Sequence, residues 1–309
     1  MKVFFKVAAT VATILATLQP AYAHHRIGVT QIVEHPSLNK IRDGIFEVLT
    51  RDISNEIDIV YENAQGNPAI ATQIGQKFAG MELDLVIPIS TPSAQAIVGN
   101  NKSIPIVFAA ISDPIEAKII NSIDKPGGNV TGVMDKPPLE RQLKFMLGII
   151  PNLSHLGVVY NPGEANSVAM LRELTKLANK HNITVIPSAA AKSADVSVAS
   201  HSLVGKVQAI FIGNDNTVVS GLEALIKVCH QNHIPLFASD PDSVERGAYA
   251  ALAYDQKEIG LQAGRIALRI LAGEKPGNIP VVAPEKISVT FNPETAKNLK
   301  LPVTLMGDL

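Results

Sequence analysis

The chain has 309 residues, of which 46% are hydrophobic and 18% are charged, and its formal net charge is −1. A chain of this length can bury a large core and favours about two domains, while the near-neutral charge does not favour nucleic acid or an anionic membrane as a partner. The single cysteine, Cys229, excludes an internal disulfide, and no paired-cysteine motif of a metal site occurs.

Residues 1–23 have the pattern of a secretory signal peptide. Two lysines precede an apolar stretch at residues 7–18, and a small-x-small cleavage pattern, Ala-Tyr-Ala, follows at residues 21–23. The apolar stretch is shorter than the roughly 20 residues that span a membrane. No cysteine follows it to carry a lipid anchor, so the chain has no lipobox. We predict cleavage after Ala23 and a soluble periplasmic protein.

Strand-like and helix-like segments alternate from Arg26 onward, which predicts parallel sheets with helices on both faces. In the first half we expect helices between strands at residues 26–30, 57–61, 84–89, 104–109 and 130–133. The pattern breaks after Asp135 at Lys136-Pro137-Pro138, which predicts the end of a first lobe.

The alternation restarts with a helix at residues 139–150. Strands are expected at 156–160, 184–186, 209–212, 236–238 and 248–253, then a long helix at 259–271 and a strand near 287–291. We therefore predict an α/β fold of two doubly wound parallel-sheet lobes joined by a multi-crossover hinge. The N-terminal lobe would hold residues 24–135 and 255–283, and the C-terminal lobe residues 136–254 and 284–309.

The turn after the strand at 156–160 has two interpretations. Asn161 as N-cap and Glu164 three residues on form a capping box, and the same residues are placed where open α/β sheets bind ligands. The helix that follows is predicted to bury one face, which consists of Val168, Leu171, Leu174 and Ala178.

Polar residues recur just after the predicted strands. Asp113, Asp215 and Asp240 could each meet a ligand ammonium or cap a helix. We favour Asp215 for the ammonium, because Pro241 follows Asp240 directly and fits a cap followed by proline. The start of the helix at Ser90-Thr91-Pro92-Ser93, where a hydroxyl could act as N-cap, offers free N–H groups to a carboxylate.

Aromatic side chains near the strand ends are candidates for stacking on a ligand ring. Tyr160 and Tyr254 are the favoured ones, because polar turns follow them. Three phenylalanines within apolar runs are assigned instead to the core: Phe108, Phe211 and Phe237.

Motifs of phosphate loops, dinucleotide sites, nucleophile elbows and zinc proteases are absent from the sequence. Cys229, His230 and His233 lie within one helical turn, but too few ligands accompany them for a zinc site. We predict no catalysis, no metal and no cofactor.

Several stretches resemble one known family. They include IGVTQIVEHPSLNKIRDG, STPSAQA, IPIVFAAISDPIEA, PGGNVTGV, YNPGEANS and PLFASDPDSVERGA. The sequence is similar to the ABC-transporter substrate-binding proteins associated with tryptophan, tyrosine and phenylalanine uptake, which look like type I periplasmic binding proteins. The resemblance implies a ligand held in the cleft between two lobes and delivery to a separate permease and ATPase.

The resemblance also implies ligand contacts by position: Thr30, Gln31, Thr91, Ser93, Ser112, Asp113, Asn161, Glu164, Asn166, Ser167, Asp215, Asn216 and Asp240. Tyr254 joins them from the stacking argument. One departure lies at the first crossover, where members often carry a hydroxyl and this chain has Met134.

The leading hypothesis is an exported, monomeric receptor for a small zwitterion, an aromatic or other apolar L-amino acid. The alternatives are a ligand-sensing subunit of a membrane receptor with the same fold and a doubly wound hydrolase. A two-lobed repressor would need an N-terminal helix-turn-helix, where this chain has a signal peptide.

Overall fold

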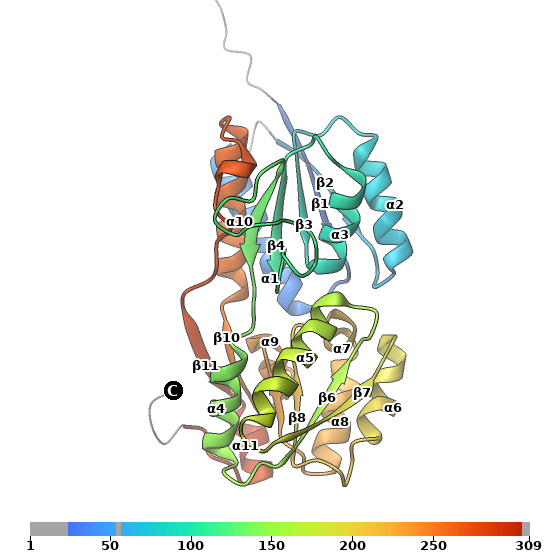
Figure 1. The fold of residues 1–309 in the computed structure, drawn as a ribbon, viewed down its shortest axis with the longest axis vertical. Coiled ribbons are helices and arrows are strands. Elements are labelled where there is room, and N and C mark those ends of the chain that lie inside the picture. The colour runs from blue at the N-terminus through green and yellow to red at the C-terminus, as the bar shows by residue number, and fades with distance from the viewer. Residues whose placement is uncertain (1–23, 54–56, 305–309) are drawn as a thin grey trace, which may run out of the picture.

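Two sheets, one in each lobe, organise the residues that this computed structural model describes, 24–53 and 57–304 (Figure 1). The first sheet is parallel throughout and has the order β2-β1-β3-β4-β5. Its strands are β1 (His25–Gln31), β2 (Ile57–Asn63), β3 (Leu85–Ile89), β4 (Ile106–Ile111) and β5 (Val130–Met134).

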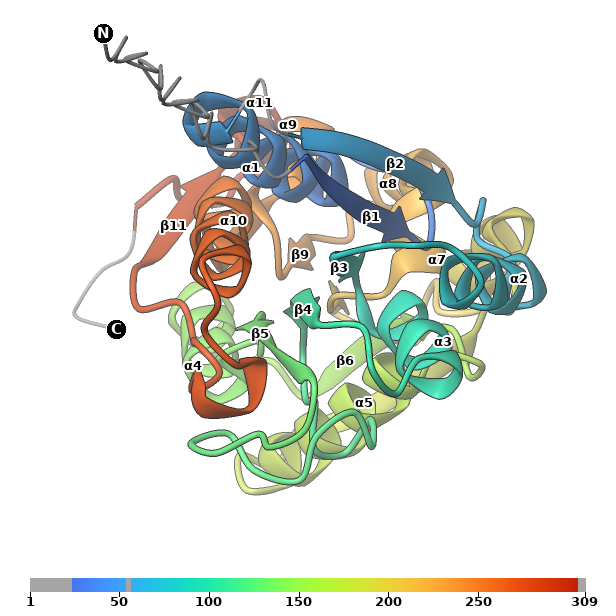
Figure 2. The ribbon, with the colours of Figure 1, turned by 90° about the horizontal axis from the view of Figure 1, so that it is seen from above.

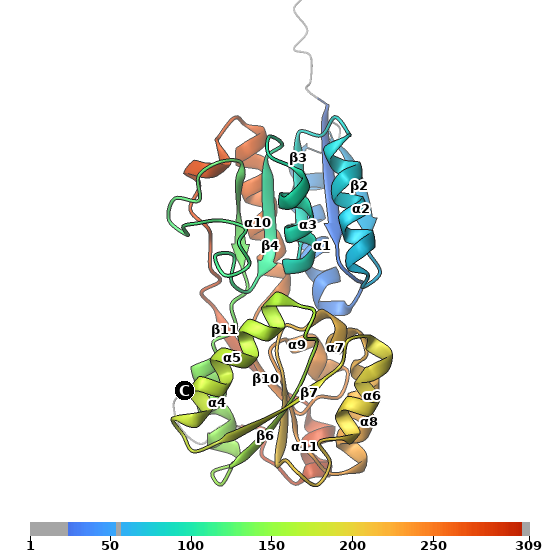
Figure 3. The ribbon, with the colours of Figure 1, turned by 45° about the vertical axis from the view of Figure 1, so that its right-hand side comes forward.

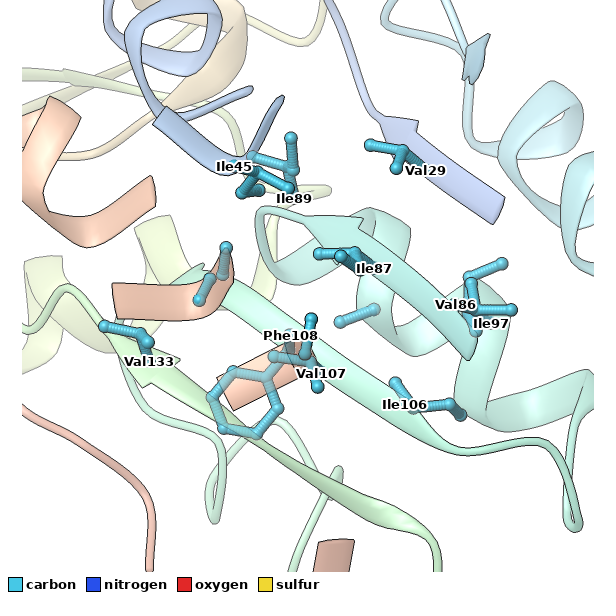
Figure 4. Packing of buried hydrophobic residues seen from close by; sticks show 14 of the residues in the cluster. Val29, Ile45, Val86, Ile87, Ile89, Ile97, Ile106, Val107, Phe108 and Val133 are labelled. Carbon is cyan, nitrogen blue, oxygen red and sulfur yellow. The ribbon is translucent and has the colours of Figure 1, made fainter. Parts of the chain in front are cut away.

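Four helices sandwich this sheet, with α1 and α10 packed together on one face and α2 and α3 on the other (Figure 2). They are α1 (Pro36–Ile53), α2 (Pro68–Ala79), α3 (Thr91–Asn100) and α10 (Gln256–Leu271). Every residue of β3 is buried, because helices cover both faces of the sheet and the strand can be apolar throughout. Figure 4 shows Ile87 and Ile106 in this core, together with Phe108, which is fully buried as predicted.

The second sheet, read from its β7 edge, repeats the order of the first as β7-β6-β8-β9-β10. Its strands are β6 (His155–Tyr160), β7 (Thr184–Ala189), β8 (Ala209–Ile212), β9 (Leu236–Ala238), β10 (Ala250–Tyr254) and β11 (Ile287–Phe291). The edge strand β11 pairs antiparallel with β10, so this sheet is mixed and not purely parallel as predicted. Phe211 and Phe237 are buried in its core, which confirms their assignment.

Two helix layers cover this second sheet. The helices α4 (Leu139–Ile149), α5 (Ala165–Asn179) and α11 (Pro293–Leu299) bury their apolar faces in one cluster. The other cluster contains residues of α6 (Val196–His201), α7 (Asn216–Ser220), α8 (Leu222–Gln231) and α9 (Pro241–Glu245). The doubly wound architecture predicted for both lobes is therefore confirmed.

The chain passes between the sheets three times, after β5, after β10 and between Val282 and β11. The outgoing and returning segments pair at the first crossing, because Met134 N donates to Val282 O at 2.8 Å and Val282 N donates to Gly132 O at 3.0 Å. This hinge contact uses backbone atoms only. The family hydroxyl that Met134 replaces is therefore not needed for it.

The buried face predicted for α5 is partly wrong. Val168 is 39% exposed, and the helix instead buries Ser167, Met170, Leu174 and Ala178. Leu171 and Met170, three and four residues before Leu174, lie on nearly the same side of the helix. The spacing alone therefore does not decide which of the two is buried. Met170 occupies the buried position because its side chain packs on Gly213, which has no Cβ to displace it.

Close packing of α1 against α10 depends on two facing glycines. A methyl group at Gly260 would lie 2.0 Å from the carbonyl oxygen of Ile41, and one at Gly44 would lie 2.6 Å from that of Lys257. These backbone atoms cannot yield as a flexible side chain can. The two glycines therefore set the distance between the helices.

We expect Gly260→Ala to lower the free energy of unfolding by about 1–3 kcal/mol, because overpacking forces the backbones of the two helices apart. The matched control is Gly99→Ala on α3, which is exposed and has no atom within 4 Å of the added methyl. Its better helix propensity should raise stability by up to about 1 kcal/mol. Urea unfolding of both variants measures the difference, and equal stabilities would contradict the packing argument.

Candidate functional site

The carboxyl ends of the strands of both sheets face each other across the lobe boundary (Figure 1). In sheets of the order 2-1-3-4-5, ligands bind at these ends, beside the point where the strand order reverses. A pocket of about 410 Å³, part of it open to solvent, lies there between the lobes. The residues that line it are His35, Ser37, Leu38, Ser90, Thr91, Ala110, Ser112, Asp135, Asn166, Asn214, Asp215, Asn216, Val219, Asp240 and Gln256.

The wall from the first lobe contains two residues in the left-handed backbone region. Ser90 has φ 77° at the start of α3, and Ala110 has φ 57° where the β4–β5 register shifts. Such strain costs about 1–3 kcal/mol for each residue, and it clusters at binding sites. The Ser90 hydroxyl makes no cap bond to α3, contrary to the sequence-based expectation, and is buried without a partner among the described residues. The start of α3 thus presents a free hydroxyl and N–H groups to the pocket.

Two carboxylates meet at the start of α7 in the second lobe. Asp215 caps the helix through Val218 N at 2.9 Å, and its other oxygen accepts from Asn161 N at 2.6 Å and from the Ser167 hydroxyl. Glu164 reaches the same helix start from the β6–α5 turn. Burial and the charge of Glu164 raise the pKa of Asp215 well above its ordinary value.

The capping box predicted at the start of α5 is not formed. Glu164 is the N-cap residue of α5 but makes no side-chain cap bond there. Its carboxylate accepts from the backbone N–H groups of Asn216 and Thr217 at 3.1 and 2.9 Å, and from both of their side chains. Asn161 instead forms a local turn through Gly163 N. The carboxylate therefore serves a helix that begins 52 residues further along the chain.

Asp240 caps α9, as its Pro241 predicted. It accepts from Ser243 N at 2.8 Å and from the Ser243 hydroxyl at 2.7 Å. It also accepts from the Ser37 hydroxyl of the other lobe at 2.8 Å. Since Asp215 and Asp240 are both caps, capping does not distinguish them, and the preference for Asp215 as ammonium partner stays a prediction.

Six of the fourteen predicted site residues line the pocket: Thr91, Ser112, Asn166, Asp215, Asn216 and Asp240. Asn161, Glu164 and Ser167 do not line it but hold Asp215 or α7 in place. Asn161 and Glu164 line a second pocket between the lobes, which shares Asn216 with the first. The remaining five do not line it, namely Thr30, Gln31, Ser93, Asp113 and Tyr254. Gln31 donates to Val33 O and to the side chain of Asn39, and Asp113 accepts from two N–H groups of its own turn.

Several lining residues were not among the ligand contacts expected from the sequence. The most polar are His35, Asp135, Asn214 and Gln256. Each follows a strand within four residues, so a uniform strand-end rule would have found them. His35 is buried, its Nδ1 accepts from Leu38 N at 3.4 Å, and burial lowers its pKa to about 4, which leaves the ring neutral. It is the only aromatic ring in the lining, because Tyr160 and Tyr254 pack against the two cores.

Across residues 24–53 and 57–304, no group of three histidine, cysteine or acidic side chains is arranged to hold a metal ion. Cys229 is buried, and burial raises its pKa to about 12, so the thiol is held in its unreactive protonated form. No helix within these same residues is long and apolar enough to cross a membrane.

Polar contacts join the lobes on both sides of the pocket. On one side α1 meets α9, where Lys40 pairs with Asp242, a carboxylate that is only 2% exposed. On the other side α3 meets α5 (Figure 3), and there the Arg172 side chain pairs with Glu116. The lobes are therefore closed over the pocket.

This fold and site define a class: two-lobed proteins that enclose a small ligand between the carboxyl ends of two sheets. The family model of the ABC transporter substrate binding protein matches residues 26–306. A tyrosine-binding protein from Clostridioides difficile is 37% identical over 279 residues, which are 89% of this chain and 81% of the relative. The chain therefore belongs to the ABC transporter substrate-binding protein family, as its sequence motifs indicated.

Two solved structures bear on the lobe arrangement. An ABC domain from Streptococcus pneumonia in complex with L-Trp is 30% identical, covers 91% of this chain and 96% of its own, and superposes with a TM-score of 0.88. A substrate-binding protein from Clostridium difficile in its ligand-free, open structure is 33% identical and covers 90% and 95%, but its TM-score is 0.68. At similar identity, this chain therefore superposes better on the ligand-bound structure than on the open one.

We expect Asp215→Asn to make the free energy of unfolding less dependent on pH. Asparagine keeps the cap but removes one of two buried carboxylates at α7. The native pKa of Asp215 is raised, so its contribution to stability is fully present below its unfolded pKa of about 4 and is lost as pH rises toward its native pKa. Relative to the variant, the wild type should therefore lose stability over that interval.

Urea midpoints at a series of pH values from 4.5 to 8 test this. The matched control is Asp113→Asn, because Asp113 caps an exposed turn outside the pocket. Parallel pH profiles for the wild type and Asp215→Asn would contradict the argument.

Proposed function

We propose that this protein captures an aromatic or other apolar L-amino acid between its lobes and delivers it to an ABC permease and its ATPase. The observation that carries the proposal is the chemical division of the pocket between the lobes. Its first-lobe wall presents hydroxyl and N–H donors. Three aspartates also line the pocket, whereas no lysine or arginine does. A zwitterion carries a carboxylate that the donors could bind and an ammonium group that the aspartates could bind.

The donor wall is suited to the ligand carboxylate. The start of α3 provides free N–H groups and the positive end of a helix dipole, with the hydroxyls of Ser90 and Thr91 beside them. Ser112 lies in the same wall at the end of β4. These groups would pair a carboxylate without a cationic side chain, which the lining does not contain.

The acidic part is suited to the ligand ammonium. Asp135, Asp215 and Asp240 are all buried, and a buried carboxylate is costly unless a cation or hydrogen-bond donors compensate it. A sugar brings no positive charge to such a site. The acidic lining therefore favours an amine-bearing ligand.

The side chain of the ligand would meet Leu38, Val219 and the neutral ring of His35. These groups provide apolar surface, and an imidazole face can stack on an aromatic ring. The tyrosine-binding relative and the L-Trp complex support an aromatic side chain in the ligand. Together these observations favour an aromatic amino acid over a small polar one.

We expect aromatic L-amino acids to raise the thermal midpoint. A ligand that binds only the folded protein adds RT ln(1 + [L]/Kd), about 2.7 kcal/mol at a hundredfold excess over Kd. Differential scanning fluorimetry with the twenty L-amino acids measures the shift, with the D-enantiomers and a set of sugars as controls. A large shift with a sugar and none with any amino acid would refute the proposed ligand class.

We also propose that the protein acts in the periplasm after cleavage behind Ala23. Substrate-binding proteins of ABC transporters are typically extracytoplasmic, which agrees with the signal-peptide pattern of residues 1–23, a segment outside the described residues. Intact-mass measurement of exported protein should give a chain that begins at His24. A product that keeps residues 1–23 and partitions into membranes would contradict this proposal.

A further inference from the structure

The three aspartates of the pocket differ in how fully their oxygens are hydrogen-bonded. Asp215 and Asp240 each accept three hydrogen bonds, and both of their oxygens take part. Asp135 accepts two, from Asn214 Nδ2 at 2.9 Å and Gln256 Nε2 at 3.4 Å, and both reach Oδ2. The described residues provide no donor for Asp135 Oδ1.

The charge of Asp135 is also uncompensated. The side chain is buried, with 4% of the residue exposed, and the charged group that acts most on it is another carboxylate, Asp240. No lysine or arginine lines the pocket to balance these charges. Burial together with this repulsion raises the pKa of Asp135 to about 7, which is the behaviour of a carboxylate that lacks a cation.

Asp135 also occupies the hinge. It directly follows β5 at the first crossing between the sheets, and Gln256 begins α10 just after the second crossing. Asn214, at the end of β8 in the second lobe, donates to both the backbone oxygen and the carboxylate of Asp135, at 3.0 and 2.9 Å. The Asp135 side chain therefore contacts the pocket, the second lobe and the start of α10.

We propose that Asp135 receives the ligand ammonium through Oδ1, and that its hydrogen bonds to Asn214 and Gln256 tie this ion pair to the closed arrangement of the lobes. The inference rests on the proposed function, since it requires an amine-bearing ligand. The ammonium supplies both the donor that Oδ1 lacks and the cation that the pocket lacks. This assignment replaces the sequence-based preference for Asp215 as the ammonium partner. Asp215 and Asp240 then act as helix caps that shape the second-lobe wall.

The test compares ligands with and without the amine. Binding of L-phenylalanine and of 3-phenylpropanoate, which is the same molecule without the amine, is measured by calorimetry or competition for the wild type and Asp135→Asn. The wild type should prefer the amine-bearing ligand by about 30-fold or more, the range found when one partner of a buried charge pair is lost. In Asp135→Asn this preference should fall to within a fewfold. If the wild type prefers another aromatic amino acid, that compound and its amine-free form replace this pair.

Control variants distinguish Asp135 from the other aspartates that could bind the ammonium. Asp113→Asn, outside the pocket, should keep the full preference for the amine. Asp215→Asn and Asp240→Asn test the two other aspartates of the pocket. Loss of the preference in either of them, with Asp135→Asn unchanged, would overturn the proposal and leave the proposed function standing.

Two further measurements keep the outcomes distinct. The ligand-free thermal midpoint of Asp135→Asn should equal or exceed that of the wild type, because an uncompensated buried charge is removed; Asp135→Ser serves as a second variant if Asn impairs folding. A wild type that binds no L-amino acid overturns the proposed function and this inference together. A wild type that binds amino acids while Asp135→Asn and Asp135→Ser keep the amine preference overturns the inference alone.

Discussion

The structure depends on buried carboxylates at strand ends, held in place by backbone N–H, hydroxyl and side-chain amide donors. Asp215 and Asp240 start two short helices, α7 and α9, and Glu164 supports the first of them from a neighbouring turn. Five-residue helices have little stability of their own, because nucleation costs more than so few hydrogen bonds return. The carboxylates compensate for this by satisfying N–H groups that a short helix leaves free. The second-lobe wall of the pocket therefore depends on these acidic residues.

In the proposed function, the same acidic residues make the pocket selective for an amine-bearing ligand. Carboxylates that accept several donors can remain buried at tolerable cost, whereas one with a free oxygen and no cation remains poorly compensated. In this protein the stabilising acids and the poorly compensated acid lie side by side in one pocket. A ligand with a positive charge relieves the imbalance, while a neutral ligand of the same size does not. Charge compensation would thus provide specificity without any cationic side chain in the wall.

Closure of the lobes combines two kinds of contact. At the pocket itself, Ser37 donates to Asp240 in a buried hydrogen bond across the boundary. At the rims, partly exposed ion pairs such as Lys40 with Glu245 and Lys136 with Asp113 join the lobes. Exposed pairs contribute little, about 0–1 kcal/mol each, and are weakened by salt. The rim pairs therefore add little to the stability of the closed arrangement, whereas the buried hydrogen bond at the pocket is not weakened in this way.

The sequence by itself determined the alternation of strands and helices, the two-lobed α/β fold and the family, because these follow from local periodicity and from motifs spread over the chain. It also placed the polar residues at strand ends. Which of those residues line the pocket was decided only by tertiary structure. Glu164 and Asp240 take partners 52 and 203 residues away in the sequence, and the least compensated aspartate, Asp135, looks locally like a linker residue. Hydrogen-bond satisfaction and burial are properties of the packed chain, and no local pattern encodes them.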